Sequence, residues 1–321
     1  MISAEFVKQS AYKLGFSACG LCRAGRISDD WAEKIRKYVE EGRNGEMEYL
    51  ARNMDLRMDA RKLVPGTKTI VSVALNYYPA KKMDSDNSFT LSYHAYGKDY
   101  HEVVKQRLKL LFEIISENLA SQGITLEGRA FCDTAPVPER SWAWRAGVGF
   151  IGKSTLLIIP RKGSFFFLGE LFLSDEADAY DEPLTNLCGS CTKCMDSCPG
   201  KALFEPFKID ARRCLSYLTI ERRGPLPEGT AEKMGSGIYG CDVCQRVCPH
   251  NRFAEPTAVS EFAPSEKLLS MTREDWEGLT EEEFRSLFKG SSVKRAKYSG
   301  LKRNIDAVDR KNEENKRHQE N

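Results

Sequence analysis

Eight of the eleven cysteines fall between residues 188 and 248, at spacings that suit metal binding. The first four stand as Cys188-x2-Cys191-x2-Cys194-x3-Cys198 and are followed at once by Pro199. This run matches the bacterial ferredoxin pattern, in which three cysteines bind one 4Fe–4S cubane and the fourth reaches across to a second cubane. The spacing therefore predicts iron–sulfur clusters, which transfer electrons one at a time.

A second group of cysteines repeats the ending of this pattern but lacks one ligand. It reads Cys241-x2-Cys244-x3-Cys248 before a proline, and Cys214 lies between the two groups, where it can supply the missing thiolate. The crossing rule divides the eight cysteines into two sets of four. The first set is Cys188, Cys191, Cys194 and Cys248, and the second is Cys198, Cys214, Cys241 and Cys244.

The alternative for these cysteines is a pair of zinc ribbons, because C-x2-C pairs also bind zinc. Zinc-binding pairs are usually separated by longer loops and do not need the C-x2-C-x2-C-x3-C-P run, so iron–sulfur clusters are favoured. The start of the chain has no signal-peptide pattern, and no apolar stretch is long enough to span a membrane. We therefore expect a cytoplasmic protein, whose many cysteines bind metal because disulfides are rare in that reducing compartment.

Three further patterns are formal matches to known motifs, and each has a structural alternative. Cys19-x2-Cys22 lies in a strand-like run with no other ligand nearby, so packing is its expected role. Residues 147–154 fit the phosphate-binding loop, but the helical pattern precedes them and the strand pattern follows, the reverse of what such a loop needs. Asp99-x-His101 resembles part of a cobalt-ligand motif that continues with a glycine absent here, so His101 is expected to be structural.

The residues before the cysteine cluster, 1–177, predict a mixed α/β domain in which helices cover a sheet. Ser3 is placed to cap a helix that runs to Leu14, and helical patterns recur over 100–120 and 139–146. Short apolar or alternating runs between these helices predict strands. The expected strands are Phe16–Cys22, Ile70–Tyr77, Arg129–Cys132, Thr155–Ile159 and Phe165–Leu173.

The rest of the chain divides into two segments. Residues 178–255 predict a bacterial-ferredoxin-like domain with two 4Fe–4S clusters, whose metal replaces much of a hydrophobic core. Residues 256–321 predict a short helical basic tail, in which Thr280 and Glu283 form a capping box. The tail is basic over Val293–Lys302 and polar over Asp309–Asn321, where we expect frayed or disordered chain.

Several further runs, in one order from about residue 1 to 305, resemble the epoxyqueuosine reductase family. They are Phe131–Arg140, Ala146–Thr155, Gly163–Glu170, the cysteine block, Asp210–Glu221 and Gly290–Lys297. The resemblance implies cobalamin in the first domain, beside one cluster, and reduction of the epoxide of epoxyqueuosine at the wobble position of a tRNA anticodon to queuosine. Many members continue into a C-terminal helical-repeat region, and the chain is expected to be a short form without it.

The resemblance also implies roles for individual residues. Asp133 matches the family's general acid, and its mostly apolar sequence neighbours would raise the carboxyl pKa and keep it protonated. The alternative is a structural role, in which Asp133 caps the turn into the helix over 138–146. The residues expected to contact cobalamin are Arg57, Asp133, Lys153, Ser154 and Ser216. Cys132, which precedes the proposed acid, is left without a role.

The substrate and partners follow from the resemblance and from local charge, because the formal net charge of only +2 gives no field that would attract RNA to the whole molecule. The expected tRNA contacts are Arg222, Lys294, Arg295 and Lys297. Tyr298 is a candidate stacking surface, although such a charged run is often only a solvated helix face. We expect a monomer that receives electrons from a flavodoxin or ferredoxin. The alternative functions are a cobalamin-dependent reductive dehalogenase and a plain two-cluster electron carrier.

Overall fold

The computed structural model describes the backbone of residues 1–320 and the side chains of residues 1–311. Its main sheet has the strand order β1–β2–β7–β4, and every neighbouring pair is antiparallel. The bounds are β1 Ala18–Arg23, β2 Thr69–Asn76, β7 Phe166–Leu173 and β4 Gly128–Phe131, which confirm four of the expected strands. The fifth is shorter than expected: β6, Leu157–Ile158, pairs with β5, Phe150–Ile151, outside the main sheet.

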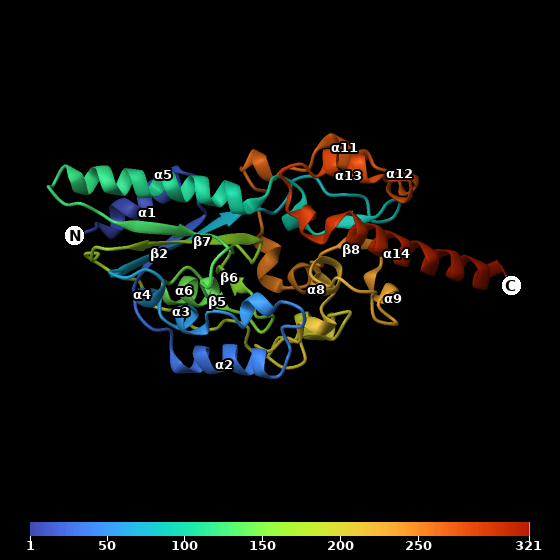
Figure 1. Ribbon diagram of the computed structural model, residues 1–321, viewed down its shortest axis with the longest axis horizontal. Helices are drawn as coiled ribbons and strands as arrows, with labels where there is room; N and C mark the ends of the chain where they lie inside the picture. Colours follow the sequence, from blue (N-terminus) through green and yellow to red (C-terminus); the bar gives the residue numbers. More distant parts are fainter. Residues whose placement is uncertain (321) are drawn as a thin grey trace.

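Helices cover both faces of this sheet, so the mixed α/β prediction is confirmed (Figure 1). The helices α1 (Ala4–Lys13) and α5 (Tyr100–Ala120) pack on one face, and α6 (Glu139–Arg145) packs on the other together with α2 (Asp29–Glu40) and the short α3–α4 segment (54–63). Because both faces are covered, seven of the eight residues of β2 are buried. Ser3 caps α1 as expected, and α5 has the expected bounds.

Each face of the sheet has its own hydrophobic core. Val71, Val73 and Leu171 pack against α1 and α5, while Ile70 and Phe172 pack against α6. The alternation of side chains along β2 and β7 places neighbouring residues in different cores. The loop after β4 leaves the sheet between α5 and α6, and so it carries residues 132–138 to the boundary between the two helical layers.

A third core lies beyond the end of the sheet and contains residues from distant parts of the chain. The strands β3 (Thr90–Leu91) and β8 (Gly237–Tyr239) pair in parallel within it. The helices around it are α8 Leu215–Ile220, α9 Ala231–Met234, α11 Glu266–Ser270, α12 Arg273–Glu277, α13 Glu281–Leu287 and α14 Lys297–Glu320. The capping box of Thr280 and Glu283 is present at α13. This core therefore connects the segment before α5 with the C-terminal helices.

The end of the chain differs from the sequence-based expectation. The helix α14 continues to Glu320, so the expected frayed or disordered segment is helical over residues 309–320, and Asn321 lies outside the described residues. The polar composition of residues 309–320 gave no sign of a helix. The helix is a continuation of one that starts at Lys297 and buries Leu301, Ile305 and Val308 in the third core. Among the described residues, no helix is both long and apolar enough to cross a membrane.

Candidate functional site

The clustered cysteines lie in two groups of four, and the first group comprises Cys188, Cys191, Cys194 and Cys248. Burial, followed by the charges of Cys188 and Cys248, raises the pKa of the Cys194 thiol. Burial also raises the pKa of Cys248, and Cys188 and Cys191 add to this effect. The backbone N–H of Lys153 donates to Cys188 Sγ at 3.5 Å. These mutual effects show that thiols from both ends of residues 188–248 are neighbours.

The second group comprises Cys198, Cys214, Cys241 and Cys244. Burial, followed by the charges of Cys241 and Cys214, raises the pKa of the Cys244 thiol well above its usual value. Burial raises the pKa of Cys241 to about 11, and Cys214 and Cys198 contribute. Asp242, inside this group, is itself buried. One cysteine of each group lies on a short helix, Cys194 on α7 (Lys193–Asp196) and Cys244 on α10 (Val243–Arg246), and the two helices pack together. Two sets of four thiols on tight turns fit the ligands of two 4Fe–4S clusters.

Asp133 lies in the loop after β4 and has a φ of +48°, a left-handed conformation that aspartate tolerates better than most residues. Its backbone N–H donates to Glu139 Oε1 at 2.5 Å. Its carboxylate is 62% exposed, accepts a hydrogen bond from the Tyr100 hydroxyl and lies 3.7 Å from His101 Nε2. The capping alternative is wrong, because Pro138 occupies the N-cap of α6 and the Asp133 carboxylate faces α5 instead.

The first turn of α5 positions the partners of Asp133. Asp99 is the N-cap of this helix, and its Oδ1 accepts from the His101 backbone N–H at 3.0 Å and lies 2.6 Å from His101 Nδ1. The Tyr100 ring is stacked on His101 and on Phe167, with centroid distances of 4.0 and 4.2 Å. Packing thus fixes both rings, and Asp99, His101 and Asp133 form a chain of groups through which a proton can move.

The protonation of Asp133 differs from the sequence-based expectation. Partial desolvation where the carboxyl meets α5 favours the neutral acid, but the hydrogen bond from Tyr100 and the nearby His101 outweigh it and lower the pKa of the carboxyl. Burial opposes charge on His101 too, yet its contacts with Asp133 and Asp99 raise the His101 pKa to about 9. The apolar sequence neighbours of Asp133 do not face its carboxylate, so the expectation of a raised pKa is wrong. Near neutral pH the pair still holds one proton, on the His101 side.

Two further carboxyls lie behind Asp133, between the sheet and α6. Burial, together with the charge of Asp133, raises the pKa of Glu139 to about 8. Glu170 is fully buried on β7, and burial and the Glu139 charge raise its pKa well above the usual range. Ser72 Oγ donates to Glu170 Oε1 at 3.2 Å, and Oε2 has no partner among the described residues. Both carboxyls therefore hold protons at neutral pH, close to a group that is placed to donate one.

Arg57 supplies an unsatisfied donor on the same side of the molecule. Only 8% of this residue is exposed, and its Nη2 donates to the Tyr49 carbonyl at 3.3 Å. Its Nε–H is buried and has no acceptor in the described part of the chain. A buried guanidinium N–H costs free energy unless an acceptor reaches it. A ligand rich in amide oxygens, such as cobalamin, would supply one, so Arg57 fits the expected contact.

The other expected cofactor contacts lie beside the cysteine groups. Lys153 Nζ donates to the carbonyls of Gly189 and Cys191 at 2.6 and 3.0 Å, so its ammonium binds the loop of the first group. Ser154 is buried next to it. The backbone N–H groups of Ser216 and its neighbour Tyr217 point at the Cys214 thiol, whose pKa is nevertheless raised by burial. Lys153 and Ser216 are thus positioned by the cysteine turns.

Arg140 and Tyr38 connect these residues to Asp133. Arg140 lowers the pKa of Asp133, and its Nη1 donates to the Thr155 carbonyl at 3.0 Å. Burial raises the pKa of Tyr38, and the charges with the largest effect on it are those of Arg140, which lowers it, and Cys214, which raises it. Asp133 and the second cysteine group are therefore close to the same side chains.

The basic residues proposed for RNA form a connected cluster. Arg295 makes a bidentate pair with Glu221, with Nε–Oε1 and Nη2–Oε2 distances of 3.1 and 2.8 Å. Arg222 Nη1 lies 3.5 Å from Glu46 Oε1, and Arg223 Nη1 donates to the Arg295 carbonyl at 2.9 Å. The remaining two, Lys294 and Lys297, are exposed at either side of Arg295.

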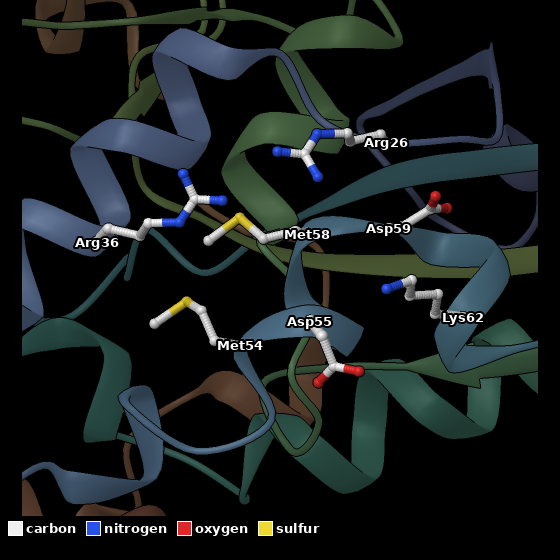
Figure 2. A pocket seen from close by; sticks show the side chains of 7 residues that line it. All are labelled: Arg26, Arg36, Met54, Asp55, Met58, Asp59 and Lys62. Carbon is white, nitrogen blue, oxygen red and sulfur yellow. The ribbon is translucent and has the colours of Figure 1, made fainter.

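One separate cavity lies between α2 and the α3–α4 segment (Figure 2). Its volume is about 240 Å³, smaller than the ~300–1,000 Å³ typical of sites for drug-sized ligands. The lining residues carry charges of both signs and are Arg26, Arg36, Met54, Asp55, Met58, Asp59 and Lys62. None of the expected catalytic or cofactor residues lines it, so it is not the candidate site.

Comparison with known proteins identifies the family. Residues 187–251 match the family model described as a 4Fe-4S double cluster binding domain, and residues 57–134 match that described as epoxyqueuosine reductase QueG, DUF1730. An epoxyqueuosine reductase from Cellulophaga algicola is 43% identical over 302 residues, which are 94% of this chain and 96% of that protein. The chain belongs to the epoxyqueuosine reductase family. The family model favours iron–sulfur clusters over zinc.

Solved structures of epoxyqueuosine reductases have the same fold as this family member. One that contains an epoxyqueuosine-modified tRNA-Tyr stem loop matches with a TM-score of 0.84 and 29% identity, over 95% of this chain and 80% of that chain. Another, from Bacillus subtilis, has its catalytic aspartate loop swung out of the active site and matches with a TM-score of 0.82 and 27% identity, over the same shares.

The site of this epoxyqueuosine reductase family member contains residues that sequence reasoning left out. His101 was expected to be structural, and it does pair with Asp99, but it also faces Asp133. Tyr100 and Glu170 had no expected role. The only sequence signal for Tyr100 and His101 is their position just after a helix N-cap. That position does not indicate contact with Asp133, which lies 33 residues after Tyr100 and 32 residues after His101.

Proposed function

We propose that this chain reduces the epoxide of epoxyqueuosine, at the wobble position of a tRNA anticodon, to give queuosine. The observation that carries the proposal is the Asp133–His101 pair, in which a charged His101 holds a proton 3.7 Å from an exposed carboxylate. Electrons and protons are both needed to remove an epoxide oxygen as water. Membership of the family supplies the substrate, because its curated members are named for this reaction.

The clusters and cobalamin would be held by residues on both sides of the site. Each group of four cysteines binds one 4Fe–4S cluster, and the residues that contact cobalamin are Arg57, Asp133, Lys153, Ser154 and Ser216. Support for Arg57 comes from its buried, unpartnered Nε–H, while Lys153 contacts the loop of the first cluster. When bound, a reduced cobalamin supplies a strong nucleophile or electron donor towards a strained C–O bond. The chain's own residues orient it, exclude water and deliver protons.

Protons for the departing oxygen come from the groups around Asp133. Opening the epoxide and releasing its oxygen as water consumes two electrons and two protons, whereas Asp133 carries at most one proton. Asp133 takes the proton that His101 holds, because the raised pKa of His101 keeps it charged near pH 7, and passes this proton to the oxygen. Glu139, bonded to the Asp133 backbone, holds a further proton nearby.

Electrons enter at the first cluster, from an acidic flavodoxin or ferredoxin in the cytoplasm. The residues between its cysteines are exposed, whereas buried residues flank the second group. Leu187 and Phe207 leave 53% and 40% of their surfaces exposed close to this group. Lys193 and Lys201 are exposed on the same segment. An apolar centre with basic neighbours suits a transient partner of opposite charge. The chain acts as a monomer.

Two other functions are less well supported. A reductive dehalogenase would share the cofactors, but the relatives that match nearly the whole chain are named epoxyqueuosine reductases. A plain electron carrier has no need for a chain of acids. Asp99 and His101 at the N-terminal end of α5 form such a chain with Asp133. This arrangement therefore favours an enzyme over an electron carrier.

The proposal is tested with anaerobic, cluster-loaded protein, cobalamin and a low-potential reductant. The substrate is tRNA from cells that accumulate epoxyqueuosine, and the product is read by nucleoside mass spectrometry. We expect the modified nucleoside to lose one oxygen atom only when cobalamin is present. Protein that retains its iron and binds cobalamin, yet leaves the nucleoside unchanged, would contradict the proposed function.

The rate is expected to depend on the proton that His101 holds. The contacts with Asp133 and Asp99 raise the His101 pKa from 6.5 to about 9, so the charged form is present below pH 9 and is lost as the pH rises through that value. Single-turnover rates should therefore fall about tenfold per pH unit above pH 9. In His101→Gln this limb should move to lower pH, whereas Glu102→Gln, an exposed change in the same turn, should leave it in place. If the rate of His101→Gln fell over the same pH range as that of the wild type, His101 would not supply the proton.

A further inference from the structure

Tyr49 is an exposed aromatic residue close to the catalytic region. It is one of only seven large hydrophobic residues recorded as exposed in the described chain, and 46% of its surface is accessible. We infer that Tyr49 is the surface on which a base of the substrate RNA stacks, next to the nucleoside being reduced. This inference rests on the proposed function and adds a binding residue to it.

The chain holds Tyr49 in a rigid loop. The Glu46 backbone N–H donates to the Tyr217 hydroxyl at 2.7 Å, and Glu46 Oε2 accepts from the Arg223 backbone N–H at 2.9 Å. A Cβ at Gly45 would come within 2.4 Å of the Tyr217 hydroxyl, so the loop lies directly against α8. Arg57 fixes the other end by its bond to the Tyr49 carbonyl. A ring on such a loop loses little further freedom when a base stacks on it.

The position of the ring connects the acid to the basic cluster. The Arg295 guanidinium carbon lies 5.6 Å from the centroid of the Tyr49 ring, and the bidentate bond to Glu221 holds that guanidinium in place. On the other side, the charge of Asp133 acts on the Tyr49 hydroxyl, as do those of Glu221 and Arg295, although burial is the main reason that the pKa of Tyr49 is raised. Tyr49 is thus within electrostatic range both of the proton donor and of the residues proposed to bind phosphate.

An RNA base is the ligand that suits these neighbours. Proteins that bind single-stranded loops stack splayed bases on aromatic rings and hold the backbone with basic side chains. Arg295 supplies positive charge at the ring, and its bond to Glu221 positions it. Arg222 pairs with Glu46 and Arg223 donates to the Arg295 carbonyl, so both belong to the same basic cluster. The bases next to the wobble nucleoside lie close to it, and the charge of Asp133 acts on Tyr49, so a base stacked on this ring would neighbour the reacting nucleoside.

Tyr298, the aromatic residue expected from the sequence to stack, is poorly placed for this role. Its hydroxyl donates to the Leu279 carbonyl at 3.0 Å, and its ring packs at 6.0 Å from Phe284 against the third core. A half-buried ring with its hydroxyl bonded inside the protein offers little surface to a base. The exposed ring nearest the basic cluster is that of Tyr49 instead.

The test measures RNA binding separately from turnover. Cluster-loaded protein without cobalamin is titrated against a fluorescent anticodon stem-loop that carries epoxyqueuosine. We expect Tyr49→Ala to weaken binding about tenfold or more, and Tyr49→Phe to stay within about twofold of the wild type, because a phenyl ring still stacks. The matched control is Tyr12→Ala, since Tyr12 is 51% exposed on α1, away from the basic cluster. Iron content and cobalamin absorption spectra are recorded for each variant.

Each outcome decides one question. Weaker RNA binding in Tyr49→Ala, with normal iron content, normal cobalamin binding and rescue by Tyr49→Phe, supports the inference. Unchanged RNA affinity in Tyr49→Ala overturns it, and so does a loss confined to cobalamin binding, which would assign Tyr49 to the cofactor. Wild-type protein that binds the stem-loop but never converts its nucleoside contradicts the proposed function and leaves the binding result to decide the role of Tyr49.

Discussion

Asp133→Asn is expected to lower the single-turnover rate of epoxide reduction by about 10²- to 10⁴-fold, the usual contribution of a positioned general acid. The amide has nearly the same shape and can still accept the hydrogen bond from Tyr100, so the loop after β4 should keep its position. It cannot release a proton to the departing oxygen or take one from His101. The loss should therefore appear in the chemical step, with iron content and cobalamin binding unchanged.

The matched control is Asp86→Asn, which removes an exposed carboxylate in the loop before β3. It should leave the rate within about twofold, because surface carboxylates away from the site contribute little. The two variants are compared under anaerobic single-turnover conditions, with the nucleoside product measured by mass spectrometry. A rate that stays within tenfold of the wild type in Asp133→Asn would show that another group donates the proton, and His101 would then be the first candidate.

Much of the fold was predictable because its signals are local. The alternation and apolar runs identified β1, β2, β4 and β7, and the cap at Ser3 identified α1, since these patterns reflect only which residues face a core. The cysteine spacing predicts two sets of four ligands, and the charge effects between the thiols are consistent with that division. A C-x2-C pair lies within one short turn, which allows few backbone conformations. The spacing alone therefore indicates that the two thiols are neighbours.

The parts that were missed depend on contacts between distant residues. The apolar neighbours of Asp133 in the sequence predicted a raised pKa, yet its carboxylate faces α5, where His101 and Tyr100 lower it. No local pattern shows that the turn at Asp99 meets the loop after β4. The strand β3 pairs with β8, almost 150 residues further along the chain. Likewise, the role inferred for Tyr49 depends on the contact between its loop and α8, which joins residues far apart in the sequence.

The cluster ligands give the second large effect. Cys214→Ala is expected to reduce bound iron from about eight to about four atoms per chain and to abolish nucleoside reduction, because it removes a thiolate from the second cluster. The charges of Cys214 and Arg140 both act on the Tyr38 hydroxyl, and Arg140 also acts on Asp133, so we expect this cluster to pass electrons to the substrate. The loss should also lower the melting temperature, since cluster binding contributes directly to the folding free energy of a segment with little hydrophobic core of its own.

Cys22→Ala is the control for this change, because Cys22 packs in β1 and belongs to neither group. It should keep its iron and its activity, at a cost of about 1 kcal/mol or somewhat more in stability for the small cavity it leaves. Iron and sulfide analysis, electron paramagnetic resonance of the reduced protein and the melting temperature are measured for both variants. If Cys214→Ala retained about eight iron atoms and two cluster signals, Cys214 would not be a ligand, and the division into two sets of four would have to be replaced.

If instead Cys214→Ala kept one cluster and full activity, electrons would reach the substrate without the second cluster. The first group would then be the one beside the cofactor, and the position of Lys153 against the Cys188–Cys191 loop would mark that contact.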